Sequence, residues 1–264
     1  MKRKGARLGQ HFLVAHWPAG KLADAAGIGA NDTVLEIGPG KGALTRELVR
    51  RAGRTIAVEK DPELASKLAS AFEKEIKEGR LLVKVGDVRS FEPASAGLKS
   101  GEYTLAANIP YYITGEIIRK FLESERKPKT MCLLVQKEVA DRIVSEKESI
   151  LSLSVKAFGT PKRVAVVGKE CFRPRPSVDS AILSVGGISR AFFTDISEEA
   201  FFRFIKAGFA AKRKKLIGNL RAAYPTQTLE EAFGHCRIDK SARAENVPLN
   251  AWKCLLVRLS SPAH

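Results

Sequence analysis

Cysteine and histidine are scarce in this sequence, with four residues of each type among 264. The cysteines lie far apart in the chain, no C-x-x-C pair is present, and no histidines stand at metal-ligand spacing. These absences argue against a metal site, and we predict that the cysteines are reduced, structural thiols. Cys132 lies in the apolar run Met131–Val135 and is expected to pack in the core.

Long hydrophobic runs are also missing. No stretch approaches the roughly 20 apolar residues that a membrane span requires, and no apolar segment follows the basic residues 1–10. We therefore expect no membrane association and a cytoplasmic protein. The hydrophobic fraction of 44% in 264 residues is enough for one large or two modest domains with a real core.

Acidic residues are too few to balance the basic ones. The 45 lysines and arginines outnumber 29 aspartates and glutamates, which gives a formal charge of +16. Such an excess predicts a polyanionic partner, usually nucleic acid, although a basic protein on a membrane surface is an alternative. The distribution favours nucleic acid, because basic residues gather in residues 1–10 and again from Arg203 to Arg221, where no acid occurs. The predicted phosphate contacts are Arg203, Lys206, Lys212, Arg213, Lys214 and Lys215.

Short β-rich runs alternate with helical patterns over the first two-thirds of the chain. The β-rich runs are 33–37, 55–58, 81–85, 103–107 and 131–135, and helical patterns cover 44–51, 64–76 and 137–144. This alternation predicts an α/β fold with a parallel sheet made of βαβ units. Two further β-rich runs, 163–167 and 181–185, predict an antiparallel pair at one edge of the sheet.

The pattern becomes helical after Gly186-Gly187. From Glu198 onward an apolar stripe recurs at helical spacing, and 251–259 is a further helical pattern. The stripe consists of Phe201, Phe202, Phe204, Ile205, Phe209, Leu216 and Leu220. We interpret it as the core of a small helical domain, and predict two domains, 1–188 and 189–264.

Residues with a ligand-binding pattern follow the predicted strands. The loop from Glu36 to Gly42 holds three glycines that allow close approach of a ligand to the backbone, and Glu59 ends the next run, where an acid accepts from ribose hydroxyls. Asp87, after the third run, is placed to accept from an adenine amino group, although an aspartate after glycine is often only a turn or a helix cap. These residues predict a nucleoside at the strand ends.

The most informative segment is Asn108-Ile109-Pro110-Tyr111-Tyr112, directly after the run 103–107. The side-chain amide of Asn108 and a carbonyl freed from regular structure by Pro110 can accept both hydrogens of an exocyclic amine, while a tyrosine ring stacks on the base. This combination predicts a pocket for adenine N6.

The glycine loop, Glu59, Asp87 and the Asn-x-Pro-Tyr motif together match the arrangement of class I (Rossmann-like), S-adenosylmethionine-dependent methyltransferases. The sequence resembles the ribosomal RNA adenine N6-dimethyltransferase family, close to the small-subunit (KsgA-type) enzymes. The matching segments are 8–13, 36–42, 57–61, 86–88, 108–111, 135–140, 172–181, 212–216 and 242–245. They are spread from residue 8 to residue 245, so the resemblance extends over nearly the whole chain.

The resemblance implies roles for individual residues. His11 and Leu13 would line the cofactor site, with His11 contacting through its backbone alone as an alternative, and Gly38 would contact the methionine end. Glu59 would contact the ribose, Asp87 the adenine amine, and Asn108 both cofactor and target. Gly40, Lys60 and Val88 complete the predicted set of cofactor-binding residues.

The resemblance also implies the reaction. S-adenosylmethionine would donate methyl groups to N6 of two adjacent adenines in the 3′-terminal hairpin of small-subunit ribosomal RNA, within a pre-30S-type particle, and the enzyme would act as a monomer. Asn108 and the Pro110 carbonyl would orient the N6 lone pair, so no strong base is needed. Tyr111 would stack on one face of the base and Phe172 on the other, although Phe172 could instead pack in the core. Tyr112 stands where bacterial relatives commonly have asparagine.

Three alternatives stay open at this point. A large-subunit adenine methyltransferase of the Erm resistance type has the same Asn-Ile-Pro-Tyr motif, but the chain length and segments 8–10 and 242–245 favour the small-subunit type. A non-catalytic ribosome-assembly factor on the same fold is the second alternative. A dehydrogenase is weaker, because the glycine spacing differs from G-x-G-x-x-G and Asp87 and Asn108 would have no role.

Overall fold

The computed structural model describes residues 11–260, and the chain forms two compact units. The first unit contains the described residues up to Asp141 together with Gly159–Ser189, and the second contains Arg142–Phe158 and the described residues from Arg190 onward. The predicted boundary at 188 lies beside the end of the first unit. The assignment of 142–158 to the first domain is corrected, because this segment belongs to the second unit.

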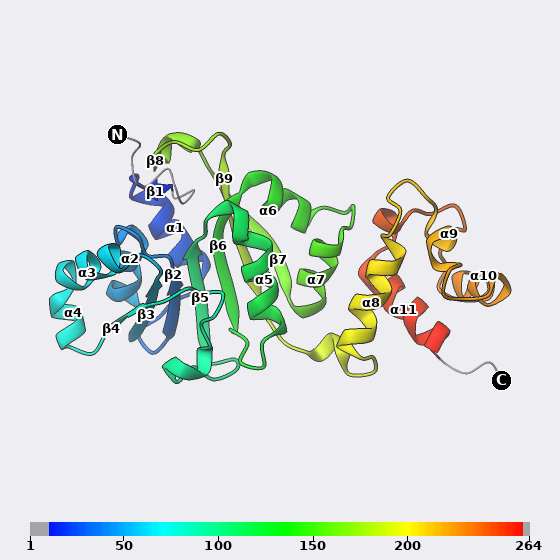
Figure 1. The fold of residues 1–264 in the computed structure, drawn as a ribbon, viewed down its shortest axis with the longest axis horizontal. Coiled ribbons are helices and arrows are strands. Elements are labelled where there is room, and N and C mark those ends of the chain that lie inside the picture. The colour runs from blue at the N-terminus through cyan, green and yellow to red at the C-terminus, as the bar shows by residue number, and fades with distance from the viewer. Residues whose placement is uncertain (1–10, 261–264) are drawn as a thin grey trace. The chain divides into compact units, whose positions relative to one another are not determined.

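A seven-stranded sheet forms the centre of the first unit (Figure 1). In spatial order its strands are β4 (Leu81–Val85), β3 (Arg54–Glu59), β2 (Thr33–Ile37), β5 (Tyr103–Asn108), β6 (Thr130–Gln136), β9 (Ser180–Gly186) and β7 (Thr160–Val167). The first five are parallel, and β9 runs antiparallel to both β6 and β7. The α/β prediction with an antiparallel edge pair is confirmed.

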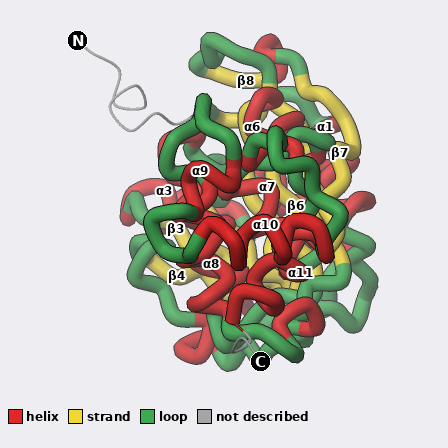
Figure 2. Tube along the Cα trace, turned by 90° about the vertical axis from the view of Figure 1, so that its right-hand side faces the viewer, coloured by secondary structure: helices red, strands yellow, loops and turns green. Residues whose placement is uncertain are grey.

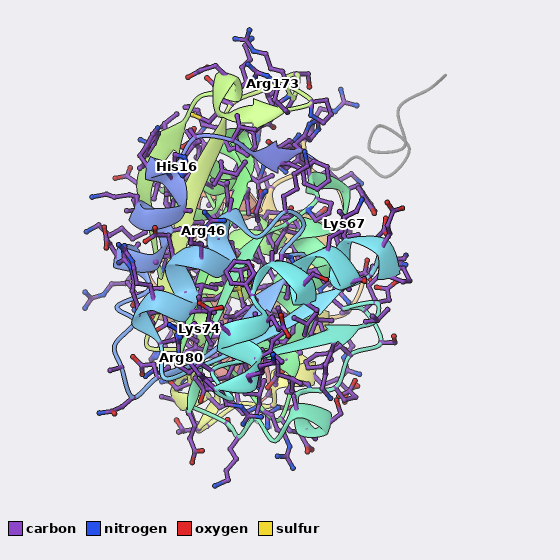
Figure 3. The ribbon with its side chains drawn as sticks, turned by 90° about the vertical axis from the view of Figure 1, so that its left-hand side faces the viewer. His16, Arg46, Lys67, Lys74, Arg80 and Arg173 are labelled. Carbon is purple, nitrogen blue, oxygen red and sulfur yellow. A yellow bond between two sulfur atoms is a disulfide. The ribbon has the colours of Figure 1, made fainter. Side chains whose placement is uncertain are left out.

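Helices cover both faces of this sheet. They are α1 (Trp17–Ala25), α2 (Ala43–Arg51), α3 (Pro62–Ala71), α4 (Glu73–Lys77), α5 (Thr114–Glu123) and the first part of α6 (Lys137–Val144), whose residues from Arg142 onward belong to the second unit. The side chains of α1 and α2 pack on one face against Val34, Cys132 and Ile182, and α5 lies on the opposite face (Figure 1). Figure 3 shows α2, α3 and α4 in front of the strands, marked by Arg46, Lys67 and Lys74.

The predicted helix 64–76 is divided into α3 and α4 at Phe72. The backbone of Phe72 leaves the helical region (φ −122°, ψ 32°), and its ring is buried against Leu68 and Leu81. Single 3-10 turns lie at Pro93–Ala96, Tyr111–Ile113, Lys169–Cys171, Ala191–Phe193 and Ala244–Asn246.

A second, two-stranded sheet was not predicted. Strand β1 (Phe12–Leu13) pairs antiparallel with β8 (Phe172–Arg173), and the amide of Val14 donates to the carbonyl of Cys171 at 2.8 Å. This pairing holds the segment after residue 10 against the loop between β7 and β9. It therefore positions His11, Phe12 and Leu13 at the ends of the central strands.

The second unit is helical. Its helices are α7 (Ile150–Phe158), α8 (Glu198–Gly208), α9 (Leu216–Leu220), α10 (Thr226–His235) and α11 (Leu249–Ser260), drawn in red in Figure 2. The described part of this unit contains no strand. The predicted apolar stripe forms its core, in which Phe201, Leu216 and Trp252 are fully buried. Leu153 and Ala157 of α7 pack in the same core, which explains why 142–158 belongs to this unit.

The cysteine prediction is partly wrong. Cys236, at the end of α10, and Cys254, in α11, form a disulfide with their Cα atoms 5.8 Å apart. The two helices pack against each other, and a sequence separation of 18 residues gives no sign of this proximity. Cys132 and Cys171 are free and buried, and the expected core packing of Cys132 is confirmed. Between residues 11 and 260 no helix has the length and apolar character needed to cross a membrane.

Candidate functional site

A pocket of about 370 Å³ lies at the carboxyl ends of β2, β3, β4 and β5. In parallel α/β sheets, ligands bind at this edge, because the loops that follow the strands converge there. All nine residues predicted to bind the cofactor line the pocket, as do Pro110 and Tyr111. The nine are His11, Leu13, Gly38, Gly40, Glu59, Lys60, Asp87, Val88 and Asn108.

The loop between β2 and α2 forms one wall of the pocket. Gly38 and Gly40 have φ values of +64° and +56°, which side-chain-bearing residues rarely adopt. A Cβ atom added to Gly40 would stand 3.0 Å from the ring of Phe12, which covers the loop. The Lys41 ammonium lies 5.1 Å from the centre of the same ring. Phe12 therefore closes the loop from the side of β1, a contact that was not predicted.

Glu59 connects this loop to the next strand. Its carboxylate is buried and accepts hydrogen bonds at 3.0 Å from the backbone amides of Gly40 and Asp61. One oxygen takes each bond, so each keeps capacity for a further donor. The carboxylate thus fixes two loops and can still accept from a ligand hydroxyl.

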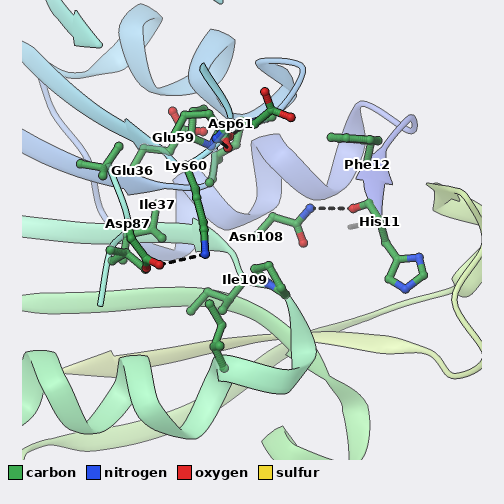
Figure 4. A pocket seen from close by; sticks show the side chains of 18 of the residues that line it. His11, Phe12, Glu36, Ile37, Glu59, Lys60, Asp61, Asp87, Asn108 and Ile109 are labelled. Atoms are coloured by element: carbon green, nitrogen blue, oxygen red, sulfur yellow. Dashed lines mark hydrogen bonds and ion pairs between the residues drawn. The ribbon is translucent and has the colours of Figure 1, made fainter. Parts of the chain in front are cut away.

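Asp87 is already paired with two cations. Its carboxylate accepts from the Arg89 guanidinium at 2.5 Å. It also accepts from Lys60 Nζ at 2.9 Å (Figure 4). The Arg89 side chain, the Arg89 backbone amide and Lys60 together hold the pKa of Asp87 well below its usual range. Asp87 is therefore an anion under all ordinary conditions. Arg89 lines the pocket but was not among the predicted site residues.

Glu36 is a further pocket residue to which the sequence assigned no role. Its side chain is 1% exposed, and neither carboxylate oxygen has a hydrogen-bond partner among residues 11–260. Burial raises its pKa to about 8, against a smaller opposing effect of the neighbouring Thr45. The sequence feature that could have identified Glu36 is its position as the one acidic residue of the buried strand β2.

Asn108 is held in one orientation. Its Nδ2 donates to the backbone carbonyl of His11 at 3.1 Å, and Figure 4 shows its oxygen directed away from His11. The amide assignment follows from chemistry, because a backbone carbonyl can only accept. Asn108 Oδ1 is consequently available as an acceptor at the pocket. His11 contributes its backbone carbonyl to this bond, and whether it contacts a cofactor through its backbone alone stays a prediction.

Tyr111 is fixed by contacts on its ring and on its hydroxyl. The ring stacks on His11 with a centroid distance of 5.6 Å, and the hydroxyl forms a hydrogen bond of 2.7 Å with Ser180 Oγ. Burial raises the pKa of the phenol, so it stays protonated. His11 Nδ1 in turn donates to the Pro174 carbonyl at 2.8 Å. This chain of contacts connects the Asn-x-Pro-Tyr segment to β1 and β9.

The prediction for Phe172 is corrected. Its side chain is 0% exposed and packs in the core with Leu13, Val167 and Ile182. Pairing of β8 with β1 directs the ring inward, so it does not line the pocket. The alternative of core packing is the observed arrangement.

The predicted RNA-binding residues all belong to the second unit. Arg203 and Lys206 lie on α8, whereas Lys212–Lys215 lie in the turn before α9 and not on a helix. Asn219 fixes this turn by donating to the carbonyls of Gly208 and Ala211 at 2.6 and 3.2 Å. The four basic side chains are exposed.

Comparisons with known proteins show similarity over nearly the whole chain. The family model described as ribosomal RNA adenine dimethylase matches residues 1–259. A Ribosomal RNA small subunit methyltransferase A from Dehalococcoides mccartyi (strain ATCC BAA-2266 / KCTC 15142 / 195) is 40% identical over 98% of this chain and 89% of that protein. Another, from Mycoplasmopsis pulmonis (strain UAB CTIP), is 34% identical over 97% of this chain and 99% of that protein.

Two solved structures are also similar over nearly the whole chain. The 23S rRNA methyltransferase ErmE has a TM-score of 0.77 at 27% identity, covering 95% of this chain and 100% of that chain. A dimethyladenosine transferase from Plasmodium falciparum has a TM-score of 0.79 at 25% identity, covering 93% of this chain and 96% of that chain.

Proposed function

The chain belongs to the ribosomal RNA adenine dimethylase family, and we propose that it dimethylates N6 of two adjacent adenines in the 3′-terminal hairpin of small-subunit ribosomal RNA. The methyl donor is S-adenosylmethionine. The observation that carries the proposal is the fixed Asn108 amide, whose oxygen has no partner among residues 11–260 and which lines the same pocket at the strand ends as Tyr111. The relatives named small subunit methyltransferase A support the choice of subunit.

The pocket fits S-adenosylmethionine. The glycines at positive φ leave the backbone open to a ligand, and the unpaired oxygens of Glu36 are buried polar atoms that a cationic ligand group would satisfy. Gly38 and Gly40 would hold the methionine end, Glu59 the ribose hydroxyls, and Asp87 with Val88 the adenine. When bound, S-adenosylmethionine supplies an electrophilic methyl group on a sulfonium.

The residues at the pocket then prepare the target amine. An adenine N6 lone pair is delocalised into the ring, so the amine is a poor nucleophile until its hydrogens are held out of the ring plane. Asn108 Oδ1 and the Pro110 carbonyl accept these two hydrogens, and the Tyr111 ring supports the base. The Pro110 carbonyl also accepts from the Ile113 amide at 3.1 Å, which fixes its direction and leaves one lone pair.

No general base is required by this scheme. Methyl transfer leaves a cationic nitrogen whose proton is acidic and departs to water. Tyr111 keeps its proton because its pKa is raised by burial, so the phenol acts through its ring and its hydrogen bond to Ser180. Placement of the amine is therefore the main contribution of the protein.

The second unit supplies phosphate contacts to the RNA. Arg203, Lys206 and Lys212–Lys215 are exposed, and the turn that carries the last four is held by Asn219. A fixed cluster of cations suits a folded RNA backbone within a pre-30S-type particle. We further propose that the protein acts as a monomer in the cytoplasm.

Replacing Asn108 with alanine tests the catalytic assignment. Loss of one preorganised acceptor is expected to slow methyl transfer on the order of 100-fold or more. RNA affinity should stay within about twofold, because the phosphate contacts are on other residues. Asn31→Ala, at an exposed turn, is the matched control and should keep full activity. Retained activity in Asn108→Ala would refute the role of Asn108, and loss of RNA binding would point to misfolding.

A large-subunit substrate is the second candidate function, favoured by the similarity to the 23S rRNA methyltransferase ErmE. Incubating separated small and large ribosomal subunits with the protein and labelled S-adenosylmethionine distinguishes the two candidate substrates. We expect label in small-subunit RNA. Label confined to large-subunit RNA would support the second candidate, and binding without any transfer would support a non-catalytic assembly factor.

A further inference from the structure

Tyr112 is an exposed aromatic side chain at the pocket. It lines the same pocket as Asn108 and is 67% exposed. Within residues 11–260, no stacked ring and no hydrogen bond engages its side chain, and the charged group that interacts with it is the Arg89 guanidinium. A large aromatic ring kept in water at the mouth of a ligand pocket indicates a contact that is completed by the ligand.

The other aromatic residues at the pocket are already engaged. Tyr111 has its ring on His11 and its hydroxyl on Ser180. Phe12 covers Gly40 and lies beside Lys41. Phe172 is fully buried and does not line the pocket. A base that enters the pocket can meet Tyr111, but it needs a second aromatic surface to offset the loss of stacking in the RNA.

The backbone of Tyr112 is also fixed. The residue lies in the 3-10 turn Tyr111–Ile113, which is closed by the hydrogen bond from the Ile113 amide to the Pro110 carbonyl. Helix α5 follows directly and is anchored by the buried side chains of Thr114, Ile117 and Ile118. Only the side-chain torsions of Tyr112 are free, so little entropy is lost when its ring stacks.

We propose that Tyr112 is a substrate-binding residue that stacks on the extruded target adenine in place of the expected Phe172. The inference rests on the proposed function, because it takes the occupant of the pocket to be an adenine of ribosomal RNA. The ring supplies the interaction, and the hydroxyl is not required.

Three variants test this role. In Tyr112→Leu the aromatic face is lost, and we expect kcat/KM for unmethylated small ribosomal subunits to fall about 10-fold, the size expected for one stacked base. Tyr112→Phe keeps the face and should stay within about twofold of the unchanged protein. Trp17→Leu removes an aromatic residue that is 49% exposed and does not line the pocket, and it should have no effect. The dissociation constant for S-adenosylmethionine should be the same in all proteins.

A spectroscopic measurement separates stacking from a structural role. In a small-subunit RNA hairpin with 2-aminopurine at the target position, stacking quenches the fluorescence of the extruded base. We expect the Tyr112→Leu complex to be brighter than the complexes of the unchanged protein and Tyr112→Phe. Equal brightness and equal kcat/KM in all proteins would overturn the inference, and so would a Tyr112→Phe protein as impaired as Tyr112→Leu. If the unchanged protein transfers no methyl group, the proposed function itself fails.

Discussion

Glu36 shows how one buried residue can make the free energy of unfolding depend on pH. The carboxyl group is almost completely buried without a hydrogen-bond partner, and its pKa is raised from 4.5 to about 8. In the unfolded chain the same group ionises at lower pH. The folded protein therefore holds one more proton than the unfolded chain between these values, and the free energy of unfolding falls as pH rises from 4.5 to about 8.

The variant Glu36→Gln should remove this pH dependence. The neutral amide has no charge to bury, so the difference in stability between pH 5 and pH 9 should shrink by on the order of 2–4 kcal/mol. Urea unfolding of the cofactor-free protein at both pH values measures it. Glu102→Gln, which changes an exposed glutamate, is the control and should leave the pH dependence unchanged. An unaltered profile in Glu36→Gln would show that another group is responsible.

At the residue scale, the residues that line the pocket were easier to predict than the side chains that contact them. The sequence identified Asn108 and Asp87 as ligand-binding residues, and both line the pocket. It did not show that His11 fixes the Asn108 amide or that Arg89 pairs with Asp87. These contacts depend on the side-chain conformations that follow from the folded backbone. Whether the residues perform their predicted roles stays a proposal.

The glycine loop between β2 and α2 is the element on which the cofactor site depends most. Gly40→Ala should weaken S-adenosylmethionine binding by about 10-fold or more, because the new methyl group meets the Phe12 ring 3.0 Å away and strains a φ of +56°. Isothermal titration calorimetry measures the affinity.

Gly27→Ala is the matched control for this loop. Gly27 has a similar φ of +62°, but no atom lies within 4 Å of the added carbon. Both variants should lose about 1 kcal/mol of stability from backbone strain. Only Gly40→Ala should lose cofactor affinity. Equal affinities in the two variants would contradict the role of the loop.

Elements with strong periodicity were predicted closely, and short ones were not. The runs 33–37 and 81–85 coincide with β2 and β4, and 137–144 coincides with α6. Strands β1 and β8 have only two residues each, which is too short for an alternating pattern. Their pairing buries Phe172, so a residue predicted to stack on the substrate became a core residue.

The charge of the whole molecule leads to a prediction about salt. Replacing Lys212, Arg213, Lys214 and Lys215 with glutamine should weaken binding of small-subunit RNA. The slope of log affinity against log salt concentration should become less steep by about 3, because each lost phosphate contact contributes about 0.7–0.9. Filter binding at several salt concentrations measures the slope.

A charge-matched control uses Lys67, Lys74, Lys77 and Lys99, which are exposed and lie near glutamates. Two of them, on α3 and α4, are visible in Figure 3. Their replacement changes the net charge equally but should alter the slope little. Similar slopes for both quadruple variants would mean that net charge, and not the cluster, determines RNA affinity.

The division of the whole chain was only partly predictable. Gly186-Gly187 lies close to the end of the first unit, as predicted from the sequence. Residues 142–158 belong to the second unit because Leu153 and Ala157 pack with residues far away in sequence. The disulfide between Cys236 and Cys254 escaped prediction for the same reason. Such long-range packing leaves no local signal.

The most direct test of the central claim is mass spectrometry of small-subunit RNA after incubation of unmethylated small subunits with the protein and S-adenosylmethionine. We predict N6,N6-dimethyladenosine at two adjacent positions of the 3′-terminal hairpin, and no new methyl group when Asn108→Ala replaces the unchanged protein. Small-subunit RNA that stays unmethylated, or that is methylated at positions other than adenine N6, would contradict the claim.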